Sequence, residues 1–189
     1  DDTLQLVCNG EIYNSPQLRE ALIAKGHRFK TATDVEVILH LYEEYGDDCV
    51  KHLRGMFAFA LWDSVKRRLL MARDHLGQKP LFFCQKNGGF AFASEVKSIL
   101  ASEIIKPEID LEGLWHYMSL RFMPDHHSLF KGIEKLPAAH YLVLEGNLIT
   151  VNRYWDVDFK DKLTASKEDI TDQLDELLLD TVKGHLLSD

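Results

Sequence analysis

A nearly continuous apolar run, "MFAFALWD" at residues 56–63, constrains the fold of this chain more than any other feature. A run of this length is typical of a β-strand that is buried on both faces. The turn "SVKR" follows it, and "RLLMARD" at residues 68–74 predicts a return strand. A sheet with apolar residues on both faces needs a covering layer on each side, so we expect stacked layers rather than a single exposed sheet.

Antiparallel hairpins account for most of the other predicted strands. Asn87-Gly88 is the strongest short hairpin signal in the chain and joins strands at residues 79–86 and 89–95. A last hairpin, at residues 140–155, turns at "EGN". Strands and helices therefore follow one another without regular βαβ repeats, which favours an α+β fold. We expect a four-layer α/β/β/α sandwich, in which helices cover two stacked antiparallel sheets.

Amphipathic or capped segments predict five helices beside these strands. They lie at residues 15–25, 34–45, 47–55, 94–101 and 110–120. Four of them start at a residue type that commonly caps a helix N-terminus. The expected caps are Ser15, Asp34, Ser94 and Asp110. In the short third helix Cys49 falls together with Val50 and Leu53, which indicates a core position for this cysteine.

The composition argues against several classes of function. The formal net charge is −8, so no broad nucleic-acid surface is expected, and no apolar run approaches the ~20 residues that span a bilayer. The three cysteines are widely spaced without a C-x-x-C pair, so neither a disulfide framework nor a thiolate metal site is indicated. His126-His127 lacks helical spacing and carboxylate neighbours, and we interpret it as a solvated loop pair. We expect no metal site and a reducing, cytoplasmic setting.

The stretch "LVCNGEIYN", residues 6–14, holds the first candidate chemistry. Cys8 ends an apolar strand and has no histidine near it in sequence, so packing is favoured over a role as nucleophile. Asn9 and the Gly10 backbone N–H could face one developing negative oxygen, and the Glu11 carboxylate could hold an ammonium group. The alternative is a simple turn at Asn9-Gly10, and the spacing alone favours that turn.

Asp34, Arg73-Asp74 and Lys79 are ambiguous in the same way. Asp34 stands where a helix cap belongs, and only a second carboxylate on the same ligand would give it a further role. Arg73 and Asp74 are expected to form a structural ion pair at a strand end. Lys79 precedes Pro80 and marks a turn.

An amphipathic helix follows a polar stretch at the end of the chain. Residues 159–170 are rich in charged side chains and indicate a linker. In the helix at residues 171–189, a set of mostly apolar residues shares one face. The set comprises Leu174, Leu177, Leu178, Thr181 and Val182. Such a stripe needs an apolar partner, so we expect this helix to begin a second, truncated domain.

Seven segments, taken together, resemble the asparagine synthetase family, and in particular its glutamine-hydrolysing domain. That domain is a class II glutamine amidotransferase of the N-terminal-nucleophile (Ntn) hydrolase type. The segments are "NGEIYN" (9–14), "TDVEVILHLYEEYG" (33–46), "LRGMFAFALWD" (53–63), "RDHLGQKPLFF" (73–83), "FASEVKSIL" (92–100), "KGIEKLPAAHYLVL" (131–144) and "RYWD" (153–156). They occur in the family's order and cover nearly the whole chain to residue 156, which is more specific than any single motif.

The resemblance implies a mechanism. In the family, a cysteine at the mature N-terminus attacks the side-chain amide of L-glutamine, which gives a glutamyl thioester and ammonia. By resemblance, Asn9 and the Gly10 N–H form the oxyanion hole, while Glu11 and Asp34 bind the α-amino group of glutamine. The cysteine nucleophile would lie upstream of the first residue of this chain, and the position of Cys8 is usually apolar in the family. We therefore expect this chain alone to be inactive as a glutaminase.

The resemblance also implies a domain organisation. Residues 1–158 correspond to the glutaminase domain without its N-terminal strands, residues 159–170 to a linker, and residues 171–189 to the first helix of a truncated synthetase domain. That second domain uses ATP and Mg²⁺ to amidate aspartate with the released ammonia. Its S-G-G-x-D-S motif is missing from this chain, for which we expect no cofactor. The expected partners are L-glutamine and the chain's own synthetase domain; a homodimer is compatible with the family, and no nucleic acid or membrane is expected.

Two alternatives remain open beside a ligase of asparagine biosynthesis. A domain of this type without its nucleophile could be a non-catalytic module that binds glutamine and regulates a partner. The second domain could instead amidate another acid or close a lactam ring. The residues encoded upstream of Asp1 would test the first alternative, and the pocket of the synthetase domain would test the second.

Overall fold

The structure, a computed structural model, describes residues 3–124, 126–160 and 162–186. Residues 1–2, 125, 161 and 187–189 lie outside the described part, and with them the start of the expected glutaminase domain and the end of the expected last helix. Within the described residues, no helix is long and apolar enough to cross a membrane.

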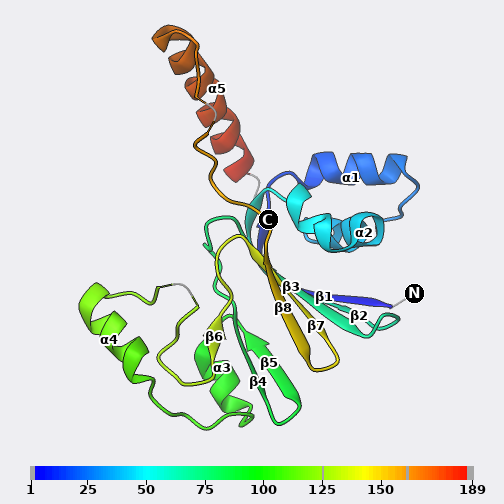
Figure 1. The fold of residues 1–189 in the computed structure, drawn as a ribbon. Helices are drawn as coiled ribbons and strands as arrows, with labels where there is room; N and C mark the ends of the chain where they lie inside the picture. Colours follow the sequence, from blue (N-terminus) through cyan, green and yellow to red (C-terminus); the bar gives the residue numbers. More distant parts are fainter. Residues whose placement is uncertain (1–2, 125, 161, 187–189) are drawn as a thin grey trace.

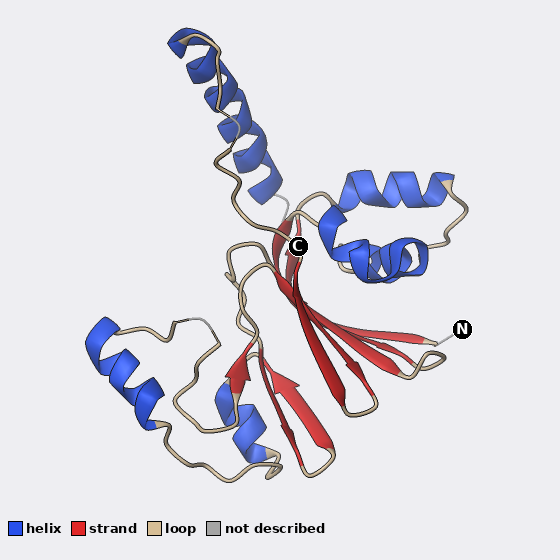
Figure 2. Ribbon diagram, viewed as in Figure 1, coloured by secondary structure: helices blue, strands red, loops and turns tan. Residues whose placement is uncertain are grey.

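Two antiparallel sheets pack face to face (Figure 2). Among the described residues, the larger sheet has the order β1-β2-β3-β7-β8 and the smaller has the order β5-β4-β6. The strands of the larger sheet are β1 (Leu4–Ile12), β2 (Gly55–Asp63), β3 (Arg68–Arg73), β7 (His140–Glu145) and β8 (Leu148–Arg153). Those of the smaller sheet are β4 (Phe82–Lys86), β5 (Gly89–Ala93) and β6 (Glu134–Lys135).

Helices cover the outer face of each sheet (Figure 1). The larger sheet is covered by α1 (Ser15–Ala24), α2 (Glu36–Tyr45) and the 3₁₀ helix η1 (Gly46–His52). The smaller sheet is covered by α3 (Val96–Ala101), and α4 (Leu111–Leu120) follows on the same side of the molecule. The expected α/β/β/α sandwich of stacked antiparallel sheets is confirmed.

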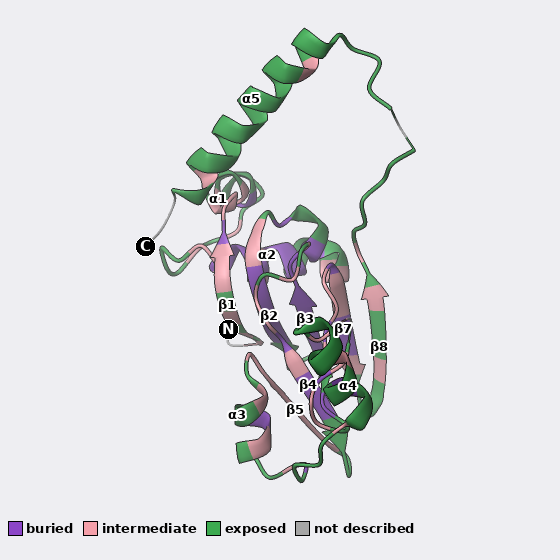
Figure 3. Cartoon of the chain, turned by 90° about the vertical axis from the view of Figure 1, so that its left-hand side faces the viewer, coloured by how far each residue is buried: buried purple, intermediate pink, exposed green. Residues whose placement is uncertain are grey.

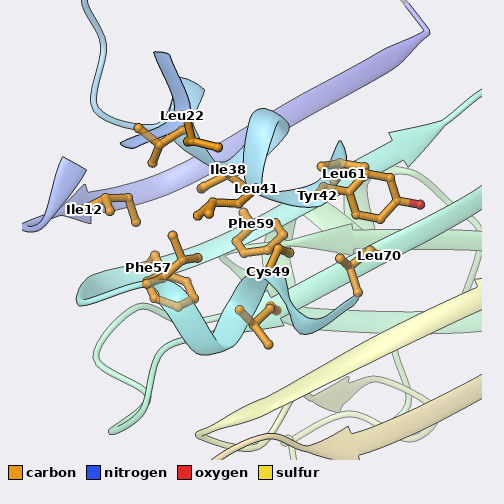
Figure 4. Packing of buried hydrophobic residues seen from close by; sticks show 14 of the residues in the cluster. Ile12, Leu22, Ile38, Leu41, Tyr42, Cys49, Phe57, Phe59, Leu61 and Leu70 are labelled. Atoms are coloured by element: carbon orange, nitrogen blue, oxygen red, sulfur yellow. The ribbon is translucent and has the colours of Figure 1, made fainter. Parts of the chain in front are cut away.

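Strand β2 is buried on both faces, as the apolar run predicts. Phe57, Phe59 and Leu61 point into the helical layer, where they pack against residues of α1, α2 and η1 (Figure 4). Ala58 and Ala60 alternate with them and face the smaller sheet. Because side chains alternate between the two faces of a strand, this one segment contributes to both hydrophobic layers.

The hairpin at Asn87-Gly88 is also confirmed. It joins β4 to β5, which pair antiparallel. Asn87 has a φ of 53° and Gly88 a φ of 77°, so both residues are left-handed, as a type I′ turn requires.

Of the four expected helix caps, only Asp110 is confirmed. Its carboxylate accepts hydrogen bonds from the backbone N–H groups of Glu112 and Gly113 at 3.0 and 3.4 Å. The N-cap positions of the other three helices are held by Asn14, Val35 and Glu95, whose side chains make no cap hydrogen bond.

Tertiary contacts explain why Ser15 is not a cap. Asn14 precedes it at the N-cap position, and the Asn14 side chain reaches across to the segment that leads into β2. Its Oδ1 accepts from the Arg54 N–H at 2.9 Å and its Nδ2 donates to the His52 carbonyl at 2.9 Å. The side chain therefore ties the start of α1 to the end of η1 instead of closing the helix locally.

The last helix, α5 (Lys167–His185), begins four residues earlier than expected. Ser166 caps it, because its hydroxyl accepts from the Asp169 N–H at 3.1 Å and donates to the Asp169 carboxylate at 2.8 Å. No residue of α5 is buried; its C-terminal end contacts the sandwich, where the His185 ring lies 4.3 Å from that of Tyr13, and the rest of the helix extends outward (Figure 3). Its apolar stripe, which includes Leu174 and Leu178, is exposed.

Buried acids in the helical layer predict that stability falls at high pH. Burial, with the charge of Asp47 nearby, raises the pKa of Cys49 from 9.0 to about 12. Burial and a hydrogen bond to Asp63 raise the pKa of Tyr42 from 10.0 to about 12. Above about pH 9 the unfolded chain releases protons that the folded chain keeps, so the free energy of unfolding should decline from about pH 9 to about pH 12.

Urea unfolding at a series of pH values measures this decline. The Tyr42→Phe variant removes one of the groups whose pKa is raised, and its free energy of unfolding should therefore fall less steeply across the same range. An equally steep decline in this variant would contradict the contribution of Tyr42.

Candidate functional site

Close backbone packing at the end of β1 explains the glycine of the "NGE" stretch. Gly10 pairs with Phe57 in the β1–β2 ladder and has a φ of +148°. A Cβ atom at this position would lie 2.0 Å from the Met56 carbonyl oxygen. The expected alternative, a turn at Asn9-Gly10, is wrong, because both residues lie inside β1.

Asn9 points toward the smaller sheet and is held there by a serine. In the β1–β2 ladder it lies opposite Ala58, which faces that sheet. Its Nδ2 donates to the Ser94 Oγ at 3.1 Å. A side-chain amide carries two N–H groups, so one orients Asn9 and the second is left for a ligand. Ser94 was expected as a helix cap, and this long-range contact is its actual role.

A pocket of about 230 Å³ opens between the two sheets beside this amide. Its lining includes Cys8 and Asn9 from β1, Ala58 from β2, Phe92 from β5, and Ser94. The pocket is mostly apolar, and the Asn9 amide is a polar group at its wall.

Asp34 joins the site through the backbone of β1. Its Oδ2 accepts a hydrogen bond from the Ile12 N–H at 2.6 Å, which explains why it does not cap α2. Ile12 directly follows Glu11, so Asp34 is hydrogen-bonded to the backbone next to Glu11, although the two acidic residues are far apart in the sequence. Among the described residues, the Glu11 carboxylate has no hydrogen-bond or ion-pair partner. The arrangement leaves carboxylate oxygens available for a cationic group.

Cys8 packs on the opposite face of β1, with the helical layer. Burial, and then the negative charge of Asp34, raise the pKa of Cys8 to about 12, although Lys79 acts weakly in the other direction. A nucleophilic cysteine needs a lowered pKa. The thiol is therefore a packing group, as expected from the sequence.

Asp74 organises the loop behind the site. It is 1% exposed, and its carboxylate accepts four backbone hydrogen bonds of 2.9–3.2 Å. The donors are the N–H groups of Phe57, Leu76, Gln78 and Lys79. Phe57 is the ladder partner of Gly10, so the loop that begins at Asp74 is fastened to the strand that supports the "NGE" stretch.

The expected ion pair between Arg73 and Asp74 is wrong. The Arg73 guanidinium instead donates to the carbonyl oxygens of Gly77, Lys79 and Leu136 at 2.5–2.9 Å. Each of the two charged side chains thus binds backbone groups of the loop, because a loop without strand pairing leaves those groups unsatisfied.

His126 and His127 lie in the same loop but differ in exposure. His126 is exposed, whereas His127 is half-buried and its ring lies 5.0 Å from that of His116 in α4. His116 also approaches Glu112 at 4.0 Å, so the pair is less solvated than expected. A second group, which the sequence spacing did not suggest, brings His27 together with residues of α2 and is described below.

Comparison with known families identifies the family of this chain. A family model described as "Glutamine amidotransferase domain" matches residues 1–155. The chain belongs to this family. The matched residues of the amidotransferase domain run from β1 to β8 and include Asn9, Gly10, Glu11 and Asp34, while α5 lies outside them.

Several curated relatives match this amidotransferase chain along its whole length. Asparagine synthetase [glutamine-hydrolyzing] 3 of Bacillus subtilis is 41% identical over 189 residues, which are 100% of this chain and 31% of the relative. Asparagine synthetase [glutamine-hydrolyzing] 1 of the same organism is 37% identical over 190 residues, or 100% and 30% of the two chains. Amidase chyE of Penicillium rubens is 34% identical over 196 residues, or 100% and 28%. The chain spans about a third of the length of these relatives.

Solved structures agree on the fold of the amidotransferase domain. Glutamine phosphoribosylpyrophosphate (PRPP) amidotransferase from B. subtilis, complexed with ADP and GMP, superposes with a TM-score of 0.57 at 20% identity. The match covers 80% of this chain and 29% of the other. A structure described as the allosteric regulatory enzyme of purine biosynthesis gives the same TM-score at 19% identity. The expected Ntn-hydrolase type of fold is confirmed.

Proposed function

We propose that this chain supplies the glutamine-binding and oxyanion-stabilising half of the glutaminase site of an asparagine synthetase. The reaction would release ammonia from L-glutamine for the amidation of aspartate. The meeting of Asp34 with the end of β1, one residue beyond Glu11, carries the proposal on the structural side. The whole-length similarity to asparagine synthetases supports it on the side of sequence.

Glu11 and Asp34 would bind the α-ammonium group of glutamine. Two carboxylates that bind the same ammonium group hold it more strongly than one, and hydrogen bonds between charged groups are stronger than neutral ones. Asp34 is already fixed by the Ile12 N–H, so little side-chain entropy would be lost when the ligand arrives.

Asn9 and the Gly10 N–H would stabilise the oxyanion that forms when the glutamine amide is attacked. The donors must be positioned before the charge develops, because preorganised donors lower the barrier most. The hydrogen bond from Asn9 to Ser94 supports such preorganisation, since it fixes the amide and leaves one N–H free.

The attacking thiolate would be that of a cysteine outside the 189 residues. The raised pKa of Cys8 and its place in the helical layer support this view. We therefore expect no release of ammonia from glutamine by the purified chain. Ammonia formation that is lost in the Glu11→Gln variant would contradict this part of the proposal.

The second half-reaction would belong to a synthetase domain outside the chain. The pyrophosphate-binding motif S-G-G-x-D-S is missing here, so no residue of this chain is proposed to hold ATP or Mg²⁺. The exposed stripe of α5 supports a neighbouring domain, because apolar side chains such as Leu174 and Leu177 gain stability when they are covered. In this proposal residues 1–158 form the glutaminase domain, and α5 opens the synthetase domain.

Ligand-observed NMR with the purified chain tests the ammonium site. We expect L-glutamine to bind and N-acetyl-L-glutamine, which lacks the ammonium charge, not to bind. Glu11→Gln and Asp34→Asn should each weaken binding of L-glutamine about tenfold or more, because each removes a charged partner while it preserves shape. The Glu20→Gln variant, which removes an exposed carboxylate on α1, is the matched control and should bind like the wild type.

The outcome separates the alternatives. Wild-type binding in both site variants, or equal binding of the acetylated ligand, would remove Glu11 and Asp34 from the site. Binding that depends on both residues while a longer protein shows no glutaminase activity would favour the non-catalytic module.

A second candidate function keeps the glutaminase site and changes the acceptor. Amidase chyE matches the whole chain at 34% identity, so the fold and the site of this domain are compatible with a partner reaction other than asparagine synthesis. Steady-state assays of a longer protein with aspartate and with other carboxylic acids would distinguish the two.

A further inference from the structure

A group of two histidines and one glutamate lies where the α1–α2 loop meets α2. The Nδ1 atoms of His27 and His40 are 3.2 Å apart. Glu43 Oε2 lies 3.2 Å from the first of these nitrogens and 2.8 Å from the second. The three atoms thus form a nearly equilateral triangle, although His27 is 13 residues away from His40 in the sequence.

Hydrogen bonding accounts poorly for all three contacts. The Nε2 of His27 lies 3.0 Å from Glu44 Oε1, so in a neutral ring this nitrogen carries the proton and Nδ1 carries only a lone pair. That lone pair would then face the Glu43 carboxylate at 3.2 Å, which is a contact between two acceptors. A cation at the centre of the group would turn the contact into an attraction.

The size of the triangle matches a zinc site. With Zn–N distances of about 2.0–2.1 Å, two ligand atoms of a tetrahedral site are separated by roughly 3.3–3.4 Å. The observed separations of 2.8–3.2 Å approach this value before any adjustment to a metal. Imidazole nitrogens with one carboxylate oxygen are also a donor set that suits Zn²⁺ better than Mg²⁺.

A second layer of carboxylates supports both rings. Metal-bound histidines usually direct their other nitrogen at a carboxylate or a carbonyl. Here His27 Nε2 meets Glu44 at 3.0 Å, and His40 Nε2 faces Glu36 Oε1 at 3.8 Å. His40 Nε2 is buried and has no hydrogen-bond partner among the described residues. If the Nδ1 atom of each ring bound a metal, the Nε2 atom of each ring would therefore face a carboxylate, as is usual for metal-bound histidines.

The negative charge around the three residues and their exposure to solvent also favour the binding of a cation. The Glu36 carboxylate beside His40 accepts hydrogen bonds from the N–H groups of Lys30 and Thr31 at 2.6 and 2.7 Å, which hold its negative side chain in place. Lys25 neutralises only Glu44, to which it is bound at 2.7 Å. Both histidine side chains line an open groove of about 640 Å³, which gives an ion a path from solvent.

We propose that His27, His40 and Glu43 bind one Zn²⁺ through two Nδ1 atoms and one carboxylate oxygen. Water from the groove would complete the four ligands. The ion would fasten the segment between α1 and α2, which also carries Asp34, to the body of α2. Its role would be to stabilise this segment, and it would be separate in its chemistry from the hydrolysis of glutamine.

Equilibrium dialysis of the purified chain against Zn²⁺, followed by metal analysis, tests the proposal. We expect one equivalent of Zn²⁺ per chain at micromolar free metal, with no comparable uptake of Mg²⁺. Thermal unfolding should move to higher temperature with added Zn²⁺, because a ligand of the folded state stabilises it by mass action. Replacement by Co²⁺ should give the visible absorption of a four-coordinate ion.

The variants separate this site from other histidines. Glu43→Gln and His40→Gln should raise the dissociation constant at least about tenfold. His52→Gln, in η1, and His116→Gln, in the group on α4, are matched controls that should bind like the wild type. Circular dichroism without metal shows whether each variant is folded, and the exposed Glu43→Gln decides the result if His40→Gln is not.

Three outcomes would overturn the proposal. The first is no uptake of Zn²⁺ by the wild type at micromolar free metal. The second is equal uptake by folded Glu43→Gln. The third is a loss of binding in His116→Gln alone, which would place the metal on α4.

Discussion

The Gly10→Ala variant is expected to lose about 3 kcal/mol or more of its free energy of unfolding, and with it the binding of glutamine. The new Cβ atom would meet the Met56 carbonyl oxygen at 2.0 Å and the Phe57 Cα at 2.7 Å. Both atoms belong to the backbone of β2, so neither can move aside without breaking the β1–β2 ladder. The residue would also hold a φ of +148°, which side chains with a Cβ rarely adopt.

The Gly26→Ala variant separates the clash from the strain. Gly26 has a φ of +99°, but no described atom outside Gly26 and its two chain neighbours lies within 4 Å of a Cβ built there. This variant should therefore lose only the conformational part, about 1–2 kcal/mol. Urea unfolding of both variants measures the difference. Equal losses in the two would show that the close approach of β1 and β2 is not what requires Gly10.

The Asp74→Ala variant is expected to lose about 3–5 kcal/mol of its free energy of unfolding. The loss is expected although Asp74 forms no ion pair with a described side chain. The substitution leaves four backbone N–H groups without their acceptor in a place that is 1% exposed. The N–H of Phe57 belongs to the strand that supports Gly10. The binding of glutamine should therefore weaken with the stability of the loop.

Two further variants serve as references for the expected loss of stability in Asp74→Ala. Asp74→Asn keeps one acceptor oxygen and should lie between Asp74→Ala and the wild type. Asp158→Ala removes one exposed hydrogen bond, that from the Lys160 N–H at 2.9 Å, and should change the free energy of unfolding by less than about 1 kcal/mol. A loss in Asp74→Ala no larger than that in Asp158→Ala would contradict the role of the buried carboxylate.

Regular periodicity is what made the fold predictable from the sequence. The apolar run of β2 alternates Phe57 and Phe59 with Ala58 and Ala60, and such a run between turn signals is typical of a strand between two layers. The Asn87-Gly88 turn depends on two adjacent residues alone. By contrast, β6 has only two residues, and a pairing of that length leaves no periodic signal.

The contacts of the site could not be predicted in the same way, because they join distant segments. Asp34 and Ser94 both satisfy the local rule for a helix cap, and both bind residues of β1 instead. Which N–H group each of these side chains binds depends on which distant segments the sheets bring close to it. The roles of Asn9, Gly10, Glu11 and Asp34 came from resemblance to a family, and they remain predictions for the experiments above.

The place of β1 at one edge of the larger sheet has a consequence for protein synthesis. Among the described strands, β1 pairs only with β2, and its register joins Leu4 to Asp63. A ribosome adds about 5–20 residues per second, so β1 must wait several seconds for β2 to be made. The helices α1 and α2 are translated during that interval. Apolar residues of theirs, such as Leu22 and Ile38, can shield the waiting strand until the hydrogen-bonded ladder forms.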